Sequence, residues 1–231
     1  MIDNFKSFGF YHIISILIAI FIGLVFIFLS KKYPDKKKYI NIALAISIII
    51  IRSVRYMFDI NTGAFSIMDL FSIHVCHINL ILLAICLFKP NKNIFTFNFL
   101  VGIPTALSVV LMPGSTHQDP GLLRAIFFIM SHTMLIMGAI YLLVNYNFKI
   151  LKKDLYKYYI ISFIGIILVY IFDVVTKANF MYLNKAPKNA LLEYFYKFNF
   201  PFYQLFIYLV LIGLITLMYY ISNIPKKRAL S

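Results

Sequence analysis

Residues 9–29 read GFYHIISILIAIFIGLVFIFL, an apolar stretch of 21 residues without a charged side chain. An α-helix needs about 20 mostly apolar residues to cross a bilayer. A secretory signal peptide has a shorter apolar core and ends in small residues at a cleavage site. This stretch instead ends in Ser30, Lys31 and Lys32. We therefore expect a retained membrane-spanning helix.

The rest of the chain has the same character. Hydrophobic residues make up 62% of the 231 residues and charged residues 13%, whereas soluble domains have about 45–50% and about 25%. Pro104 is expected to kink the fourth of seven candidate spans. These facts predict an all-α, multi-pass protein of the cell membrane, with one transmembrane domain over residues 1–231 and seven helices in one bundle. The expected helices are 8–29, 39–58, 68–88, 93–112, 123–146, 157–176 and 199–221.

The positively charged residues are distributed along the chain as they are in multi-pass membrane proteins. The net charge is +14, which by itself could indicate nucleic-acid binding. Because Lys and Arg gather in short runs between apolar segments, we do not expect nucleic acid as the partner. The loops 31–38, 89–92 and 149–157 and the tail 226–228 hold fourteen of them, and the connections on the other side hold six. Because cytoplasmic loops carry the excess of Lys and Arg, we expect the N-terminus outside and the C-terminus inside.

The stretch SIHVCHIN at 72–79 places reactive side chains inside the third apolar segment. On a continuous helix, Asp69, Ser72, Cys76 and Asn79 form a polar stripe within about 80°. His74 and His77 lie to one side of that stripe. The spacing of these two histidines, without carboxylates at fitting positions, does not predict a metal site, so we expect no metal and no cofactor.

The second cysteine of this segment, Cys86, is surrounded by Ile, Leu and Ala. A cysteine in such surroundings usually behaves as a small hydrophobic residue. On a helix Cys76 and Cys86 are about 15 Å apart along the axis, too far for a disulfide. We therefore assign chemistry to Cys76 alone.

Polar side chains of other apolar segments are expected at about the same depth in the membrane as Cys76. Cys76 is about eight residues into its expected helix and His132 about nine into its own, so both lie about 12–14 Å below the outer end. Ionisable groups at membrane depth usually face the bundle interior and indicate function. We expect a pocket open towards the outer leaflet, with Cys76 as nucleophile and His132 as base. Other groups in the outer half are Arg52, Arg55, Asp59, Arg124, Ser131, Tyr170, Asp173 and Gln204.

Four ordered motifs carry a family resemblance. They are FSIHVC at 71–76, KNIFTFNFLVGIP at 92–104 with LMP at 111–113, SH at 131–132, and NFMYLNKAP at 179–187. The chain resembles the YwaF-like bacterial membrane proteins, whose animal relative is transmembrane protein 164. The resemblance implies seven helices and phospholipid acyl transfer, with a cysteine nucleophile on Cys76 and a histidine partner on His132. His77 departs from the family pattern, and its role stays open.

These observations predict a membrane-embedded acyltransferase. A phospholipid would acylate Cys76, and a lysolipid or lipoprotein would accept the acyl chain. Arg52 or Arg55 would hold the lipid phosphate, unless they only pair with acidic residues inside the bundle. A lipid hydrolase with the same dyad is one alternative, and a non-enzymatic seven-helix transporter or receptor is another. The further candidates for substrate binding are His74, Asn79, Asp173, Asn179 and Gln204.

Overall fold

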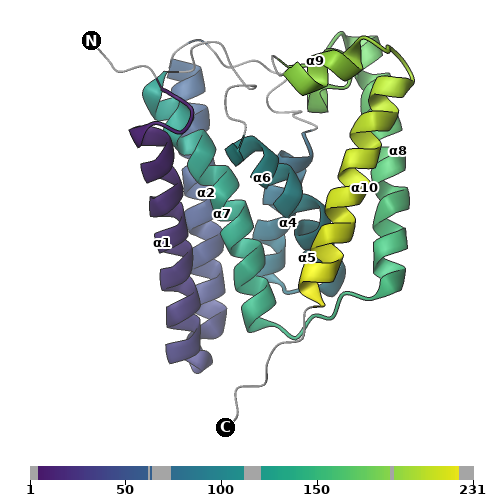
Figure 1. The fold of residues 1–231 in the computed structure, drawn as a ribbon. Coiled ribbons are helices and arrows are strands. Elements are labelled where there is room, and N and C mark those ends of the chain that lie inside the picture. The colour runs from purple at the N-terminus through teal and green to yellow at the C-terminus, as the bar shows by residue number, and fades with distance from the viewer. Residues whose placement is uncertain (1–4, 62, 64–73, 112–120, 188–189, 224–231) are drawn as a thin grey trace.

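The computed structural model describes residues 5–61, 63, 74–111, 121–187 and 190–223. Within these ranges the regular structure is helical. Two short 3₁₀ turns, Pro34–Lys36 and Phe180–Tyr182, and one π-helical segment, Asn98–Gly102, join longer α-helices (Figure 1). The α-helices are α1 (Phe10–Lys32), α2 (Lys37–Asn61), α4 (Val75–Phe88), α5 (Lys92–Phe97), α6 (Ile103–Leu111), α7 (Leu122–Asn145), α8 (Lys152–Thr176), α9 (Ala190–Tyr196) and α10 (Phe202–Ser222).

Six helical segments of the described chain are long and apolar enough to cross a membrane, as expected for a multi-pass protein. They are Phe10–Lys32, Pro34–Asn61, Lys92–Leu111, Leu122–Asn145, Lys152–Thr176 and Phe202–Ser222. The third expected helix, 68–88, differs from the prediction. His74 has extended backbone, and α4 begins at Val75 with 14 residues. The prediction of one continuous helix was therefore wrong here; its residues 68–73 lie outside the described chain.

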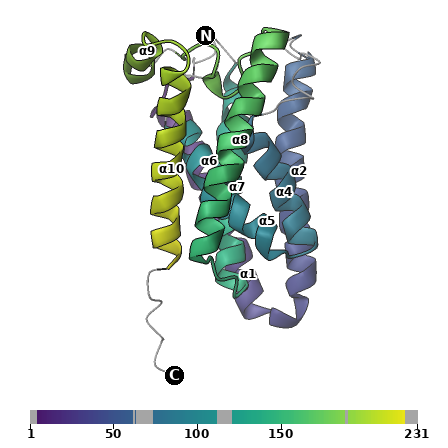
Figure 2. The ribbon, with the colours of Figure 1, turned by 90° about the vertical axis from the view of Figure 1, so that its right-hand side faces the viewer.

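Helix α7 is the centre of the bundle. It packs against α1, α2, α4 and α6, while α8 and α10 pair with each other beside the π-helical segment (Figures 1 and 2). Two glycines allow close crossings. A Cβ on Gly138 would lie 2.7 Å from Leu83 Cδ2 of α4, and a Cβ on Gly23 would lie 2.6 Å from Met137 Cβ. Small residues at helix crossings are the usual means of close packing in membranes.

The fourth expected span changes its helical pitch at its centre. The segment Asn98–Gly102 is π-helical and leads directly into Pro104. Proline has no N–H and its ring clashes with the preceding turn, so the wider turn relieves the strain that the sequence predicts there. A Cβ on Gly102 would lie 2.8 Å from Asn79 Oδ1. Glycine therefore allows α4 to approach this segment closely.

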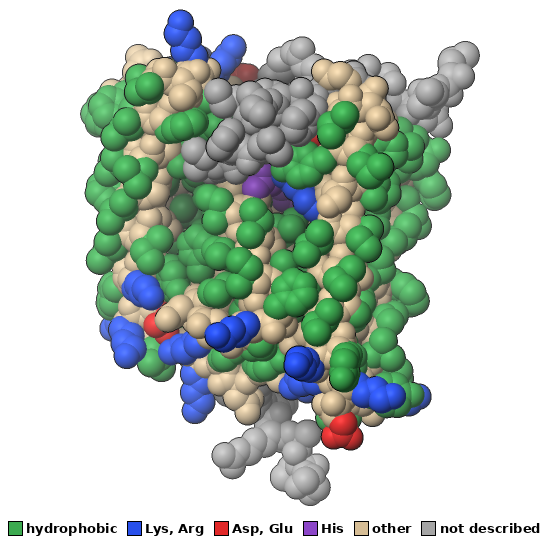
Figure 3. All heavy atoms as spheres, turned by 180° about the vertical axis from the view of Figure 1, so that it is seen from behind, with side chains coloured by type: hydrophobic (Ala, Val, Ile, Leu, Met, Phe, Trp, Pro, Cys, Tyr) green, Lys and Arg blue, Asp and Glu red, His purple; other side chains and the backbone are tan. Residues whose placement is uncertain are grey.

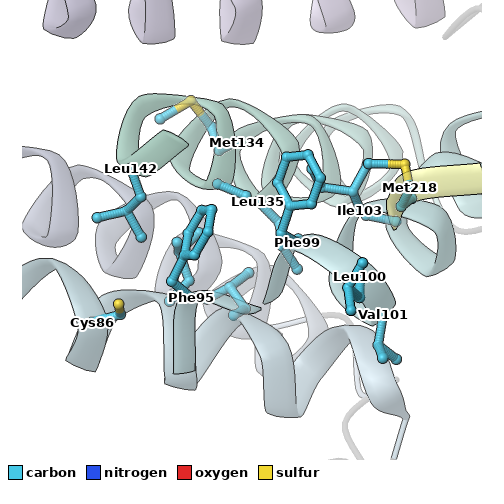
Figure 4. Packing of buried hydrophobic residues seen from close by; sticks show 14 of the residues in the cluster. Cys86, Phe95, Phe99, Leu100, Val101, Ile103, Met134, Leu135, Leu142 and Met218 are labelled. Atoms are coloured by element: carbon cyan, nitrogen blue, oxygen red, sulfur yellow. The ribbon is translucent and has the colours of Figure 1, made fainter. Parts of the chain in front are cut away.

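An apolar core surrounds the end of α4. Cys86, Phe95, Phe99, Leu135 and Leu142 are at most 1% exposed and pack together (Figure 4). Cys86 is a packing residue of this core, as its apolar neighbours predict.

The Lys runs gather at the same end of the bundle. Helix α1 ends at Lys32, α2 begins at Lys37, α5 at Lys92 and α8 at Lys152, and Figure 3 shows the resulting belt of basic side chains at the lower end. The basic tail at 226–228 lies outside the described residues. The asymmetry of charge is therefore a property of the folded chain, and its assignment to the cytoplasmic side stays a prediction.

Candidate active site

Cys76 is the second residue of α4, not the eighth of a longer helix. The first N–H groups of a helix have no partner within it, and a thiolate at a helix N-terminus is stabilised by them. The N–H groups of His77 and Ile78 donate to the carbonyl oxygen of His74 at 2.9 and 3.2 Å, and the dipole of the helix places partial positive charge beside the Cys76 sulfur. Cys76 is partly buried. The break before α4 therefore places the thiol at the positive end of a helix inside the bundle.

His132 comes from the buried centre of α7, ten residues and about 15 Å from its first residue. Its Nδ1 lies 2.7 Å from the carbonyl oxygen of Phe128. A carbonyl only accepts hydrogen bonds, so Nδ1 carries the proton and the lone pair of the neutral ring is on Nε2. The oxygen of Phe128 also accepts the hydroxyl of Ser131 at 2.8 Å. The ring of His132 is thus held in one tautomer.

The thiol and two imidazoles meet in one cluster. The Sγ of Cys76, a ring nitrogen of His77 and a ring nitrogen of His132 all lie within 4.8 Å of one another. The structure therefore brings together the two residues that the sequence analysis paired. The structure also adds His77 to the cluster. On a continuous helix, His77 was expected to lie to one side of the polar stripe that contains Cys76.

Two arginines of α2, Arg52 and Arg55, lie beside this cluster, and Asp59 of the same helix links Arg55 to Arg124 of α7. Arg55 Nε is 3.6 Å from Asp59 Oδ2, and Arg124 Nε donates to Asp59 Oδ1. Arg52 Nη2 donates to the hydroxyl of Tyr56 at 2.7 Å. Arg52 and Arg55 are 8% and 4% exposed and Asp59 is fully buried. The alternative of an internal ion pair therefore holds for Arg55, but ion pairing does not use all of the guanidinium groups.

Positive charge is in excess among the described residues of the site. Arg52 Nη1 and Arg55 Nη1 are buried and have no hydrogen-bond partner within the described chain. Both guanidinium charges act on Cys76 and on His132. The guanidinium of Arg55 also lies 4.7 Å from the ring centre of Phe128, the residue that orients His132. Figure 3 shows histidine and basic side chains between apolar ones, away from the Lys belt.

His74 joins α4 to the connection after α8. Its Nδ1 accepts the backbone N–H of Met181 at 3.2 Å, and its ring contacts those of Phe180 and His77 at centroid distances of 5.2 and 5.5 Å. His74 therefore lies next to the cluster, with one nitrogen already bonded to the connection at 177–187.

Three further candidates shape the same connection, 177–187. Asp173 Oδ1 accepts the N–H of Phe180 at 3.0 Å, and Gln204 Nε2 donates to the carbonyl of Leu183 at 2.8 Å. Asn179 donates to the carbonyl of Lys185 and accepts the N–H groups of Asn184 and Lys185. The structure thus shows these three side chains folding the connection, a role that the sequence analysis did not foresee.

Asn79 is fully buried one turn after Cys76. Its amide donates to the carbonyl of Val75 at 2.9 Å, and Oδ1, which faces Gly102, has no partner in the described part of the chain. The polar stripe predicted for Asp69, Ser72, Cys76 and Asn79 does not lie on one continuous helix, because the helix does not continue through His74. Asp69 and Ser72 lie outside the described residues. Cys76 and Asn79 do share the first two turns of α4.

A model of the TMEM164 family matches residues 7–219, nearly the whole chain. The chain belongs to the TMEM164 family. The match confirms the resemblance carried by the motifs between residues 71 and 187 and extends it towards both ends. No curated protein and no solved structure matches the chain.

In this TMEM164 family member, the site contains the elements of nucleophilic catalysis. A thiol lies at a helix N-terminus, an imidazole of fixed tautomer is close to it, and cationic groups surround both. An activated cysteine requires a base within reach and a third group that orients the base. Here that third group is the carbonyl of Phe128, which no sequence pattern identifies, because any residue four positions before the histidine offers the same oxygen.

Proposed function

We propose that this TMEM164 family member is a membrane-embedded acyltransferase that uses Cys76 as nucleophile and His132 as base. The observation that carries the proposal is the cluster in which Cys76 Sγ lies within 4.8 Å of a His132 nitrogen, while His132 Nδ1 is bonded to a backbone carbonyl. A resting enzyme often holds its nucleophile and base at a looser distance than the reacting complex requires.

In the first half of the reaction, His132 Nε2 takes the thiol proton and the sulfur attacks the ester carbonyl of a lipid. A bond forms between sulfur and carbonyl carbon, and the bond from that carbon to the glycerol oxygen breaks. His132 returns the proton to the leaving oxygen, so a lysolipid departs and a thioester remains on Cys76. The N–H groups of Val75 and Cys76, the first two residues of α4, are suited to stabilise the developing oxyanion, whereas those of His77 and Ile78 donate to the carbonyl of His74.

In the second half, His132 takes the proton of an acceptor hydroxyl or amine, and the acceptor attacks the thioester. The acyl chain leaves sulfur for the acceptor, a lysolipid or a lipoprotein, and Cys76 regains its proton from His132. If water takes the place of the acceptor, the same steps release a fatty acid. The identity of the second substrate therefore separates a transferase from a hydrolase.

Arg52 and Arg55 are proposed to bind the phosphate of the donor. Their buried Nη1 groups, which have no hydrogen-bond partner among the described residues, support this role, because leaving a guanidinium N–H buried without a partner is costly. Guanidinium groups match phosphate oxygens in bidentate fashion. A phosphodiester would supply the missing acceptors and place its neighbouring ester near Cys76.

The orientation belongs to the same proposal. With the Lys belt in the cytoplasm of a cell-membrane protein, the site lies in the outer half of the bilayer. Cysteines introduced at Asp35 and Lys153 should then resist an impermeant thiol reagent in whole cells, and one at Lys185 should react. Ready labelling at 35 and 153, with protection at 185, would contradict this orientation.

The activity is tested with purified protein in nanodiscs that contain a phospholipid with a deuterated acyl chain and one lysolipid acceptor. Mass spectrometry should find the deuterated chain on the acceptor, and Cys76→Ala should abolish the transfer while Cys86→Ala retains it. Release of deuterated fatty acid alone would assign the chain as a hydrolase. Full transfer by Cys76→Ala would overturn the proposed dyad, and no turnover in any form is the result that a transporter or receptor predicts.

A further inference from the structure

The cluster of Cys76, His77 and His132 has a composition that acyl transfer does not require. A cysteine nucleophile needs one imidazole, yet the structure places ring nitrogens of two histidines with the thiol, all within 4.8 Å of one another. One thiolate and two imidazoles are ligands that favour copper and zinc over magnesium or calcium. We propose that these three side chains bind a single Cu⁺ ion.

The positions of the donors fit a three-coordinate ion after small side-chain rotations. Ligand atoms that lie about 2.0–2.3 Å from one ion are separated by about 3.5–4 Å in a trigonal arrangement. This separation is slightly less than 4.8 Å, the distance within which the three donor atoms of the cluster lie. The hydrogen bond from His132 Nδ1 to Phe128 leaves the Nε2 lone pair for a metal. Such a bond from the second ring nitrogen to a carbonyl is the usual support of a metal-binding histidine.

The charge of the surroundings selects a monovalent ion. Arg52 and Arg55 act electrostatically on Cys76, His77 and His132. Replacing the thiol proton by Cu⁺ leaves the net charge of the cluster unchanged, so the guanidinium groups do not oppose it. Replacing the proton by Zn²⁺ adds one positive charge beside two others, which repel it. Cu⁺ is therefore preferred over Zn²⁺, although both accept the same ligands.

Binding would switch off the proposed acyl transfer. Cu⁺ displaces the proton of Cys76 to solvent without any change of oxidation state, and the ion then occupies the sulfur lone pair and the base nitrogen of His132. The bound form has neither nucleophile nor base. This inhibitory consequence rests on the proposed function, whereas the binding site itself does not.

The binding is measured by anaerobic titration of the purified, full-length protein with Cu⁺ against a chromogenic Cu⁺ chelator. Wild type should hold one equivalent, with one sulfur and two nitrogens around copper in X-ray absorption. Cys76→Ser should lose the site, and His77→Ala should weaken it by at least the ~10–100-fold that loss of a supporting group costs. Cys86→Ala is the matched thiol control and should bind as wild type does.

The preference of the site for Cu⁺ over Zn²⁺ is tested by removing the charge of Arg52. Arg52→Gln should tighten Zn²⁺ binding about tenfold and leave Cu⁺ binding within a factor of about three, because only Zn²⁺ adds charge. Equal effects on both ions would refute the charge argument. Full Cu⁺ binding by Cys76→Ser, or no competition with the chelator by folded wild type, would overturn the site. Either result leaves lipid turnover by the metal-free protein untouched, so failure of this inference is distinct from failure of the acyltransferase proposal.

Discussion

The two ends of helix α4 hold the two cysteines of the chain in opposite surroundings. Cys76, at the first turn, lies beside the helix N–H groups, two imidazoles and two guanidinium charges. Cys86, at the last turn, is fully buried in an apolar core with Phe95 and Leu142. The same side chain on the same helix therefore meets imidazole and guanidinium groups at one end and apolar side chains at the other. Reactivity follows from the neighbours, because an unassisted buried thiol is inert.

The largest expected effect is on the reactivity of Cys76 relative to Cys86, and it follows from removing His132. In His132→Ala the thiol of Cys76 loses its base, so its reaction with a lipid-like electrophile should slow by ~10²–10⁴-fold, the usual range for general base assistance. The rate for Cys86 should not change. Peptide mass spectrometry of a time course measures both cysteines in one sample.

Ser131→Ala is the matched control for that experiment. Its hydroxyl shares the carbonyl of Phe128 with His132 but does not belong to the cluster of Cys76. The variant should retain the Cys76 rate within a few-fold. An unchanged rate in folded His132→Ala would show that the imidazole does not activate the thiol.

The next effect concerns the guanidinium groups that surround only one end of α4. Arg52→Gln should lower kcat/KM for a phospholipid donor by about 10–100-fold, the scale of one charged hydrogen bond. Arg52→Lys should recover part of the loss, since it restores the charge without the planar fork. Lys92→Gln, at the Lys belt, should have no effect. Unchanged turnover in both Arg52 variants would assign Arg52 to structure alone.

The smallest effect is on stability and belongs to the other end. Cys86→Ala opens a small cavity in the core and should lower the free energy of unfolding by about 1 kcal/mol. Cys76→Ala, at a partly buried position, should lower it by less, although it abolishes turnover. Unfolding in detergent, followed by circular dichroism, measures both variants. The reverse order of stability would contradict the assignment of the two environments.

Much of the fold follows from the sequence because length and hydropathy decide which segments cross a bilayer. Six of the seven expected helices match described apolar helices within a few residues. The Cys76–His132 pairing was also predictable, since depth along two helices can be estimated from residue counts. Its basis was partly wrong, because Cys76 is at the start of α4 rather than inside a longer helix.

Other features depend on contacts that no periodicity reports. The break at His74 leaves the apolar pattern unchanged, since a broken span and a continuous one have the same composition. His77 was missed because a helical wheel places it about 100° from Cys76 and does not show that both side chains can converge on a histidine of another helix. Asp173, Asn179 and Gln204 were expected to meet substrate, and their hydrogen bonds go to the connection at 177–187. Asp173 Oδ2 and Gln204 Oε1 have no partner within the described residues, so contact with substrate stays a prediction. A polar side chain in an apolar segment shows that a partner exists without showing which partner it is.

The most direct test of the account is to locate a covalent acyl group on the two cysteines of one protein sample. The protein is purified with native lipid, digested, and analysed by mass spectrometry with and without hydroxylamine, which cleaves thioesters. We predict a hydroxylamine-labile acyl mass on the peptide that contains Cys76, none on the peptide that contains Cys86, and accumulation of the Cys76 adduct when the acceptor is omitted. A protein that transfers acyl chains without ever carrying one on Cys76 would contradict the central claim.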